Sequence, residues 1–249
     1  MSERPRHMSE TDIDAARRGL MREAACVAAS LASSAALPVL AAQAADVKRY
    51  ARTLLVDKAG EPLRARALAV GETQLFTYPY VASPVFLLRL DRAVVATALQ
   101  TEGRQAYAAP AGVGPQRSIV AFSAICAHKL MYPTPQISFI GVRKGSGSEP
   151  SQVIHCCGDN SRYDPAQGAR VIDGPAPQPL AAVLLEWEAG SDRLYAVGVQ
   201  GGEMFEAFFD KYGFKLATEL GAQARAPSGA TAMVQAASAF SRQWQSCRA

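Results

Sequence analysis

The fold of this chain is decided by two short stretches: Cys126-Ala127-His128 and, about thirty residues later, His155-Cys156-Cys157-Gly158-Asp159-Asn160-Ser161-Arg162-Tyr163-Asp164. Thiols and imidazoles are metal ligands. On a tight loop, residues two apart turn to the same side, so Cys126 and His128 can reach two neighbouring metal atoms. The second stretch adds further thiols. Together the two stretches predict a metal centre held by two loops.

Both stretches resemble the ligand loops of the Rieske [2Fe-2S] proteins, whose second loop reads Cys-x-x-His-Gly-Ser-x-Tyr-Asp. In that family one iron takes two thiolates and the other takes two imidazoles. The resemblance covers roughly residues 70–202 and includes Gly168 and the proline-rich run at 174–179, which resembles the loop that covers the cluster. It implies an antiparallel β domain with a [2Fe-2S] cluster and with Cys126 and His128 as ligands.

The second loop departs from the family pattern where its histidine is expected. Alignment on Tyr163 places Cys156 at the ligand cysteine and Asp159 at the ligand histidine. In a register one residue shorter, Cys157 and Asn160 take these places. Neither register supplies an imidazole.

Three interpretations of the fourth ligand follow. In the first, Asp159 binds iron through its carboxylate, which is a poorer match to an iron–sulfur centre than imidazole. In the second, His155 or the extra cysteine swings in, although adjacent residues of a strand point to opposite faces. In the third, the fold persists without a cluster. The candidates for the fourth ligand are therefore Asp159, Asn160 and His155.

The resemblance also implies roles around the cluster. Ser161 and Tyr163 match the family's serine and tyrosine, whose hydroxyls donate to a bridging sulfur and to a cysteine sulfur and so raise the potential. The respiratory members link their two loops by a disulfide. Met131 and Gly158 occupy those positions here, so that bridge is not possible, and Met131 is expected to pack between the loops.

The rest of residues 71–202 predicts an all-β fold, an antiparallel sandwich or barrel with inserted cluster-binding loops. Gly190-Ser191-Asp192 indicates a hairpin turn. Residues 45–68 are mixed polar sequence with short apolar runs. The strands are predicted at 74–78, 85–90, 93–99, 118–122, 137–143, 153–154, 181–187 and 193–198.

Short C-terminal helices follow the β domain. Residues 204–212 have helical spacing that ends at Gly213, and residues 230–242 form an Ala-rich helical candidate. We expect this region to cap the sandwich. The predicted organisation is a signal or anchor at 1–45, a Rieske-like domain at 46–202 and a helical extension at 203–249.

The N-terminal segment indicates export. Arg17-Arg18-Gly19-Leu20-Met21-Arg22 is a twin-arginine match, and the uncharged stretch 24–45 ends in Ala42-Gln43-Ala44, a small-residue cleavage pattern. We therefore expect a periplasmic protein. If uncleaved, residues 24–45 are long enough for an inner-membrane anchor, although Ala and Ser give little insertion energy. The remaining interpretation is an Ala-rich helix of the mature protein.

Composition and charge argue against several classes of function. The net charge is +4, and no run of Lys or Arg indicates nucleic acid. The histidines are too few for the second metal site of an oxygenase or for a Ser/His/Asp hydrolase. Leu75-Phe76-Thr77-Tyr78-Pro79 ahead of the motifs is similar to the exported Rieske subunits of arsenite oxidases and cytochrome bc complexes.

That resemblance implies an electron-transfer subunit of an oxidoreductase rather than a catalyst by itself. Its partner would be a cytochrome c, a copper protein or a larger oxidoreductase subunit. A carboxylate in place of imidazole implies a lower potential than that of a two-histidine centre. The alternative is a structural or assembly subunit of a redox complex that has lost its cluster.

Overall fold

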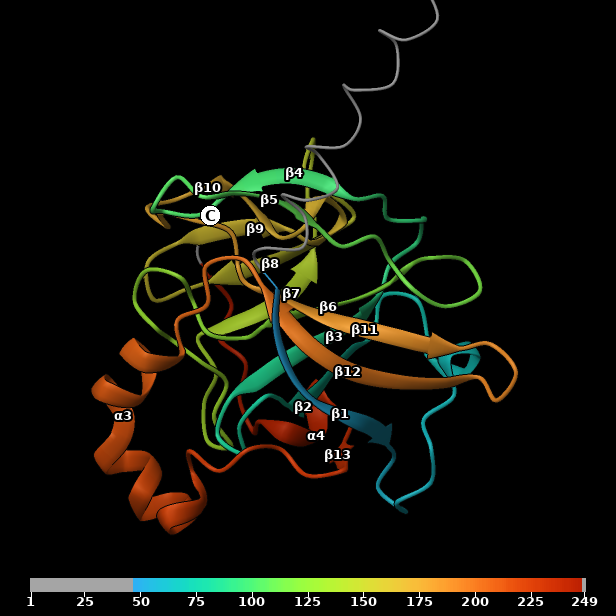
Figure 1. Ribbon diagram of the computed structural model, residues 1–249. Helices are drawn as coiled ribbons and strands as arrows, with labels where there is room; N and C mark the ends of the chain where they lie inside the picture. The colour runs from blue at the N-terminus through green and yellow to red at the C-terminus, as the bar shows by residue number, and fades with distance from the viewer. Residues whose placement is uncertain (1–46, 248–249) are drawn as a thin grey trace, which may run out of the picture. The chain divides into compact units, whose positions relative to one another are not determined.

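β-strands make up most of the regular secondary structure of the described chain (Figure 1), which confirms the all-β prediction. The computed structural model describes residues 47–247, all within one unit that spans Ala45–Ala249. Eight strands form the main sheet, in the order β13-β1-β12-β11-β6-β3-β2-β14. These strands are β1 Val47–Val56, β2 Thr73–Thr77, β3 Pro84–Arg89, β6 Ile119–Ser123, β11 Ala182–Glu188, β12 Arg193–Gln200, β13 Thr231–Met233 and β14 Gln235–Ala236.

The main sheet curls into a nearly closed barrel. Its two edge strands, β13 and β14, are separated in the chain by Val234 alone. One residue spans less than 4 Å, so the two edges of the sheet must lie next to each other. The pairing of β13 with β1 is parallel, whereas the other strand pairs of this sheet in residues 47–247 are antiparallel.

A smaller sheet is inserted between β6 and β11 and carries the predicted ligand loops. Its order is β10-β9-β8-β7. The first loop joins β6 to β7, and the second joins β8 to β9. A separate hairpin pairs β4 with β5. The bounds are β4 Thr97–Gln100, β5 Ala106–Ala109, β7 Ile140–Lys144, β8 Gln152–Cys156, β9 Ser161–Asp164 and β10 Arg170–Asp173.

Helix α3, Phe205–Leu220, covers one part of the barrel core, to which it contributes Phe205, Phe208, Phe209 and Leu216. A second apolar cluster contains residues of both sheets and includes Cys126, Cys156 and Tyr163. The metal-binding motifs are therefore part of the hydrophobic core. The other helical turns are α4 Ala237–Phe240, η1 Ala65–Ala67, η2 Pro165–Gln167 and η3 Gly221–Gln223.

Two predictions for the C-terminal region were wrong. The helix expected at 204–212 continues through Gly213 to Leu220, because the buried Leu216 anchors a further turn. Residues 230–242, expected as a helix, contain β13, β14 and only the short α4. The free edges of β1 and β2 give this segment backbone partners, and tertiary pairing outweighs the helix propensity of alanine. The segment 203–247 thus supplies strands to the barrel as well as a helix.

Within the β region, the strand predicted at 93–99 is confined to residues 97–100. Val94 is buried but Val95 is exposed, and Val94 N–H donates to Arg117 O in a loop. Strands β1 and β5 had not been predicted. β1 is exposed over most of its first half, so its sequence shows no apolar alternation.

The predicted twin-arginine signal, the stretch 24–45 and the boundary at residue 45 lie outside the described residues. In residues 47–247, no helix is both long enough and apolar enough to span a membrane.

Replacing Phe208 with Ala should lower the free energy of unfolding by about 3–5 kcal/mol, because its ring is fully buried against α3 neighbours and Tyr132. Phe214 on the same helix is 91% exposed and is the matched control. Phe214→Ala should change stability by no more than about 0.5 kcal/mol. Urea denaturation measures both. Equal losses would show that α3 does not pack as described.

Candidate metal centre

The first loop places Cys126 and His128 by a tight turn after β6. Cys126 N–H donates to Met131 O at 2.8 Å, and Leu130 N–H donates to Cys126 O at 3.1 Å. Leu130 has a positive φ of 58°, which closes the turn. Cys126 is fully buried, whereas the His128 side chain is 35% exposed. The loop therefore presents a buried thiol and an imidazole near the surface.

The second loop is a turn between Cys156, the last residue of β8, and Ser161, the first residue of β9. Asp159 Oδ1 accepts from Ser161 N–H at 2.9 Å, and Asn160 takes a positive φ of 63°. Both features are typical of a tight turn closed by an aspartate side chain. The turn holds the Asp159 side chain inward, where it is only 2% exposed.

These two loops bring two thiols and a carboxylate together, with the His128 imidazole beside the carboxylate. The ligand atoms of Cys126, Cys156 and Asp159 all lie within 4.8 Å of one another. Asp159 Oδ2 lies 3.2 Å from Cys126 Sγ and 3.1 Å from His128 Nδ1. The group thus contains two sulfurs, one ring nitrogen and one carboxylate.

Cys157 lies outside this group. It forms a disulfide with Cys247, 90 residues away. Within residues 47–247, the free thiols are Cys126 and Cys156. The register with Cys156 beside Asp159 is the one that the structure adopts, and the sulfur of Cys157 is not available as a thiolate in this state. The sequence reasoning missed this disulfide, because nothing in the spacing relates Cys247 to the second loop.

His155 and Asn160 also lie outside the donor group and bind each other. His155 is still within β8, with its ring on the face opposite to Cys156. His155 Nε2 lies 2.6 Å from Asn160 Oδ1, while its Nδ1 accepts from Arg143 Nε at 2.9 Å. Arg143 is held in turn by two bonds of 2.7 Å to Glu149. These contacts connect Asn160, in the turn of the second loop, to Arg143 on β7.

Burial is the largest cause of a lowered pKa at His155, and the nearby charge of Arg143 acts in the same direction. The ring is therefore neutral at pH 7, with Nε2–H donating to Asn160. A neutral ring with both nitrogens engaged acts here as a spacer between β7 and the second loop.

Tyr163 and Ser161 border the donor group. Tyr163 is fully buried, and its hydroxyl lies 3.5 Å from Cys126 Sγ. Burial raises the pKa of Tyr163, so it stays a hydrogen-bond donor. Ser161 Oγ accepts from Ala176 N–H at 3.1 Å and so connects the second loop to the proline-rich run 174–179.

Met131 packs against Gly158 across the two loops. A Cβ atom on Gly158 would lie 2.7 Å from Met131 Cγ. The two positions that carry a disulfide in respiratory Rieske proteins are therefore in apolar contact here, as the sequence predicted.

The thiols of Cys126 and Cys156 are hydrogen-bonded to each other, and this bond shifts the pKa values of both. The pKa of Cys126 is lowered, first by a hydrogen bond with Cys156 and then, against burial, by the backbone N–H groups of His128 and Lys129. The same bond and burial raise the pKa of Cys156. The loss of a proton is therefore easier at Cys126 than at Cys156.

The convergence of a Cys-x-His loop with a Cys-x-x-Asp loop, bordered by Ser161 and Tyr163, is similar to the ligand site of the Rieske family. Members of that family hold a [2Fe-2S] cluster between two such loops. Here Asp159 stands where that family has its second histidine.

No family model matches the chain. Iodate reductase subunit IdrB of Denitromonas iodatirespirans is 30% identical over 135 residues, which are 54% of this chain and 58% of that protein. The matched region thus spans little more than half of that relative. Among solved structures, the soluble domain of Rieske protein II (soxF) from Sulfolobus acidocaldarius aligns with 25% identity and a TM-score of 0.43, over 62% of this chain and 82% of that one.

The donors fit an iron–sulfur centre in chemistry. Two buried sulfurs, an imidazole and a carboxylate are all ligands of iron, and together they gather more negative charge than a buried site holds without cations. Cys126, His128, Cys156 and Asp159 are therefore the residues that would hold the group.

Gly174 limits how the proline-rich run meets the second loop. Its φ is +88°, and an added Cβ would lie 2.5 Å from Ser161 Cα. Gly174→Ala should therefore cost about 1–3 kcal/mol of unfolding free energy. Gly190, with nothing within 4 Å of its Cβ position, is the control. Gly190→Ala should be neutral or stabilising by up to about 1 kcal/mol. Thermal unfolding of both variants checks the difference.

The charge of Asp159 should make the stability of the metal-free protein depend on pH. Burial opposes ionisation, but the Ser161 N–H and the thiols of Cys156 and Cys126 outweigh it and lower the pKa of Asp159. Since the unfolded value is about 3.9, this stabilisation is present above about pH 4 and is lost as the pH falls through the folded-state pKa. Asp159→Asn should cost about 1–2 kcal/mol at pH 7.

The cost of Asp159→Asn should shrink below about pH 4, where the wild-type carboxyl becomes protonated. Urea denaturation of both metal-free proteins between pH 3 and 7 measures it. A cost that is equal at all pH values would show that the carboxylate charge is not stabilised in the fold.

Proposed function

We propose that this protein is an electron-transfer subunit that carries a Rieske-type [2Fe-2S] cluster on Cys126, His128, Cys156 and Asp159. The observation that carries the proposal is the convergence of the two thiols with Asp159 within 4.8 Å, next to His128. When bound, the cluster supplies one-electron chemistry. In this proposal the protein's own residues hold the cluster and adjust its potential.

Each surrounding residue has a defined part. Cys126 and Cys156 supply thiolates from inside the core. The Tyr163 hydroxyl donates toward Cys126 and favours the reduced state, whereas the anionic Asp159 favours the oxidised state. The balance is a potential below that of a two-histidine Rieske centre.

His128 is the proposed point of electron exchange. Its side chain is 35% exposed, while both thiols are fully buried. The relative IdrB is named as a subunit of an iodate reductase. By analogy we propose a larger oxidoreductase subunit as one partner and a cytochrome c or copper protein as the other.

The proposed location is the periplasm, reached by a twin-arginine signal. Support comes from Arg17-Arg18 followed by an uncharged stretch, and from the Cys157–Cys247 disulfide, since disulfides persist in oxidising compartments. Export of a folded, cluster-loaded protein suits that route. Whether residues 24–45 are cleaved is tested by N-terminal sequencing of protein isolated from the periplasm.

Low-temperature EPR with iron and sulfide analysis tests the cluster. Protein exported from its native host and reduced with dithionite should give a rhombic signal with an average g value below that of the free electron, at about two irons per chain. Folded protein without iron would reject the electron carrier and leave the alternative, a structural subunit of a redox complex.

Ligand variants test the role of Asp159. Asp159→Ala should abolish most of the iron content, while Asn160→Ala should retain the signal because Asn160 contacts His155 instead. Asp159→His should retain the cluster and raise the midpoint potential by roughly 100 mV or more. Circular dichroism confirms folding of each variant. Iron retained in Asp159→Ala would exclude the carboxylate as a ligand.

A further inference from the structure

The C-terminal tail, residues 241–247, runs along the first ligand loop. Arg242 N–H donates to Pro135 O at 3.0 Å. Ser138 donates its N–H to Gln243 O at 2.8 Å and accepts from Gln245 N–H at 2.9 Å. Ser138 and Trp244 form a parallel β-bridge. The tail thus acts as a short strand paired with the end of the first loop.

The same tail is covalently joined to the second ligand loop. Cys247 forms its disulfide with Cys157, the residue that directly follows Cys156. Cys157 N–H also donates to Phe139 O at 2.6 Å, which is next to Ser138 on the first loop. The tail, a segment of seven residues, therefore contacts both ligand loops. On the second loop it is attached next to Cys156, one of the two thiols of the candidate metal centre.

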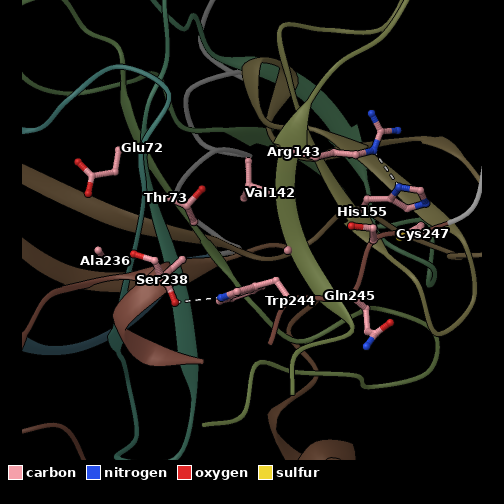
Figure 2. Close-up of a pocket in the computed structure, with 13 residues that line it drawn as sticks. Glu72, Thr73, Val142, Arg143, His155, Ala236, Ser238, Trp244, Gln245 and Cys247 are labelled. Atoms are coloured by element: carbon pink, nitrogen blue, oxygen red, sulfur yellow. Dashed lines mark hydrogen bonds between the residues drawn. The ribbon is translucent and has the colours of Figure 1, made fainter. Parts of the chain in front are cut away.

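The tail also borders a cavity of about 450 Å³, whose lining includes Val142, Arg143, His155, Trp244 and Cys247. Figure 2 shows these side chains. Trp244 packs on Gly141, where an added Cβ would lie 2.8 Å from the ring, and donates to Ala237 O. The contacts that attach the tail therefore include the pairing at Ser138, this ring and the disulfide.

We propose that the tail is a clamp that positions the two ligand loops, with Cys157 and Cys247 as positioning residues rather than ligands. The contact between Met131 and Gly158 provides no covalent bond between the loops, and the tail links them instead by a disulfide to the second loop and backbone hydrogen bonds to the first. The inference rests on the proposed function in so far as the clamped residues are cluster ligands. The clamp itself is a property of the metal-free fold.

The first experiment uses the full chain without metal. Cys126 and Cys156 are both fully buried, so iodoacetamide should label them slowly in the wild type. In Cys157→Ser/Cys247→Ser, loss of the clamp should allow local opening and raise the labelling rate of Cys126 by about tenfold or more. Ser246→Ala, an exposed neighbour that keeps the disulfide, is the control. Peptide mass spectrometry reads each site.

The second experiment uses cluster-loaded protein and separates clamp from ligand. Cys157→Ser and Cys247→Ser should behave alike, each losing iron to a chelator about tenfold faster or more and each showing a broadened EPR signal, at a temperature well below unfolding. If Cys157 were a ligand, only Cys157→Ser would lose the cluster.

Three results would overturn the proposal: unchanged thiol labelling in the double variant, unequal effects of the two single variants, or lower thermal stability with unaltered iron release and EPR. If wild-type protein contains no iron, the proposed function fails. The labelling experiment then still decides the clamp, because it needs no metal.

Discussion

The constraint on which the structure depends is the burial of two thiols and a carboxylate at one point in the core. Cys126 and Cys156 are fully buried, and the Asp159 side chain is 2% exposed. Buried polar and charged groups are costly unless they are paired. Two of these three groups are therefore surrounded by donors: backbone N–H groups and the Tyr163 hydroxyl at Cys126, and Ser161 N–H with the thiols at Asp159.

That constraint explains why the site is assembled from separate supports. The first loop is closed by its own backbone bonds, and the second is supported from behind by the contacts that run from Glu149 through Arg143 to His155 and Asn160. Gly174, which has no Cβ atom, allows the proline-rich run to pack directly against the backbone of Ser161. His155 therefore stabilises the conformation of the second loop, whereas His128 is the imidazole of the candidate metal centre.

The sequence could predict the β fold and the residues that converge, because the Cys-x-His and Cys-x-x-Asp spacings are local. It could not choose between Cys156 and Cys157, since that choice depends on Cys247, whose distance from the loop is set by the path of the whole C-terminal region. Residues 230–242 were mistaken for a helix for a related reason. Their alanines favour a helix locally, but the open edges of β1 and β2 offer strand partners that only the tertiary fold reveals.

Electrostatic repulsion limits how far the two thiols and Asp159 can ionise together. Ionisation of both thiols beside Asp159 would place three negative charges within 4.8 Å in the core, and the nearest cationic candidate in the group is the single imidazole of His128. Without metal, the hydrogen bond between the two thiols and burial raise the pKa of Cys156, whereas that hydrogen bond and backbone N–H groups lower the pKa of Cys126, so the two thiols do not ionise equally. Replacing a neutral imidazole by Asp159 adds one more negative charge, so the site should hold oxidised iron more firmly than reduced iron. In the proposed cluster site, Asp159 in place of the second histidine would then lower the reduction potential without preventing the cluster from binding.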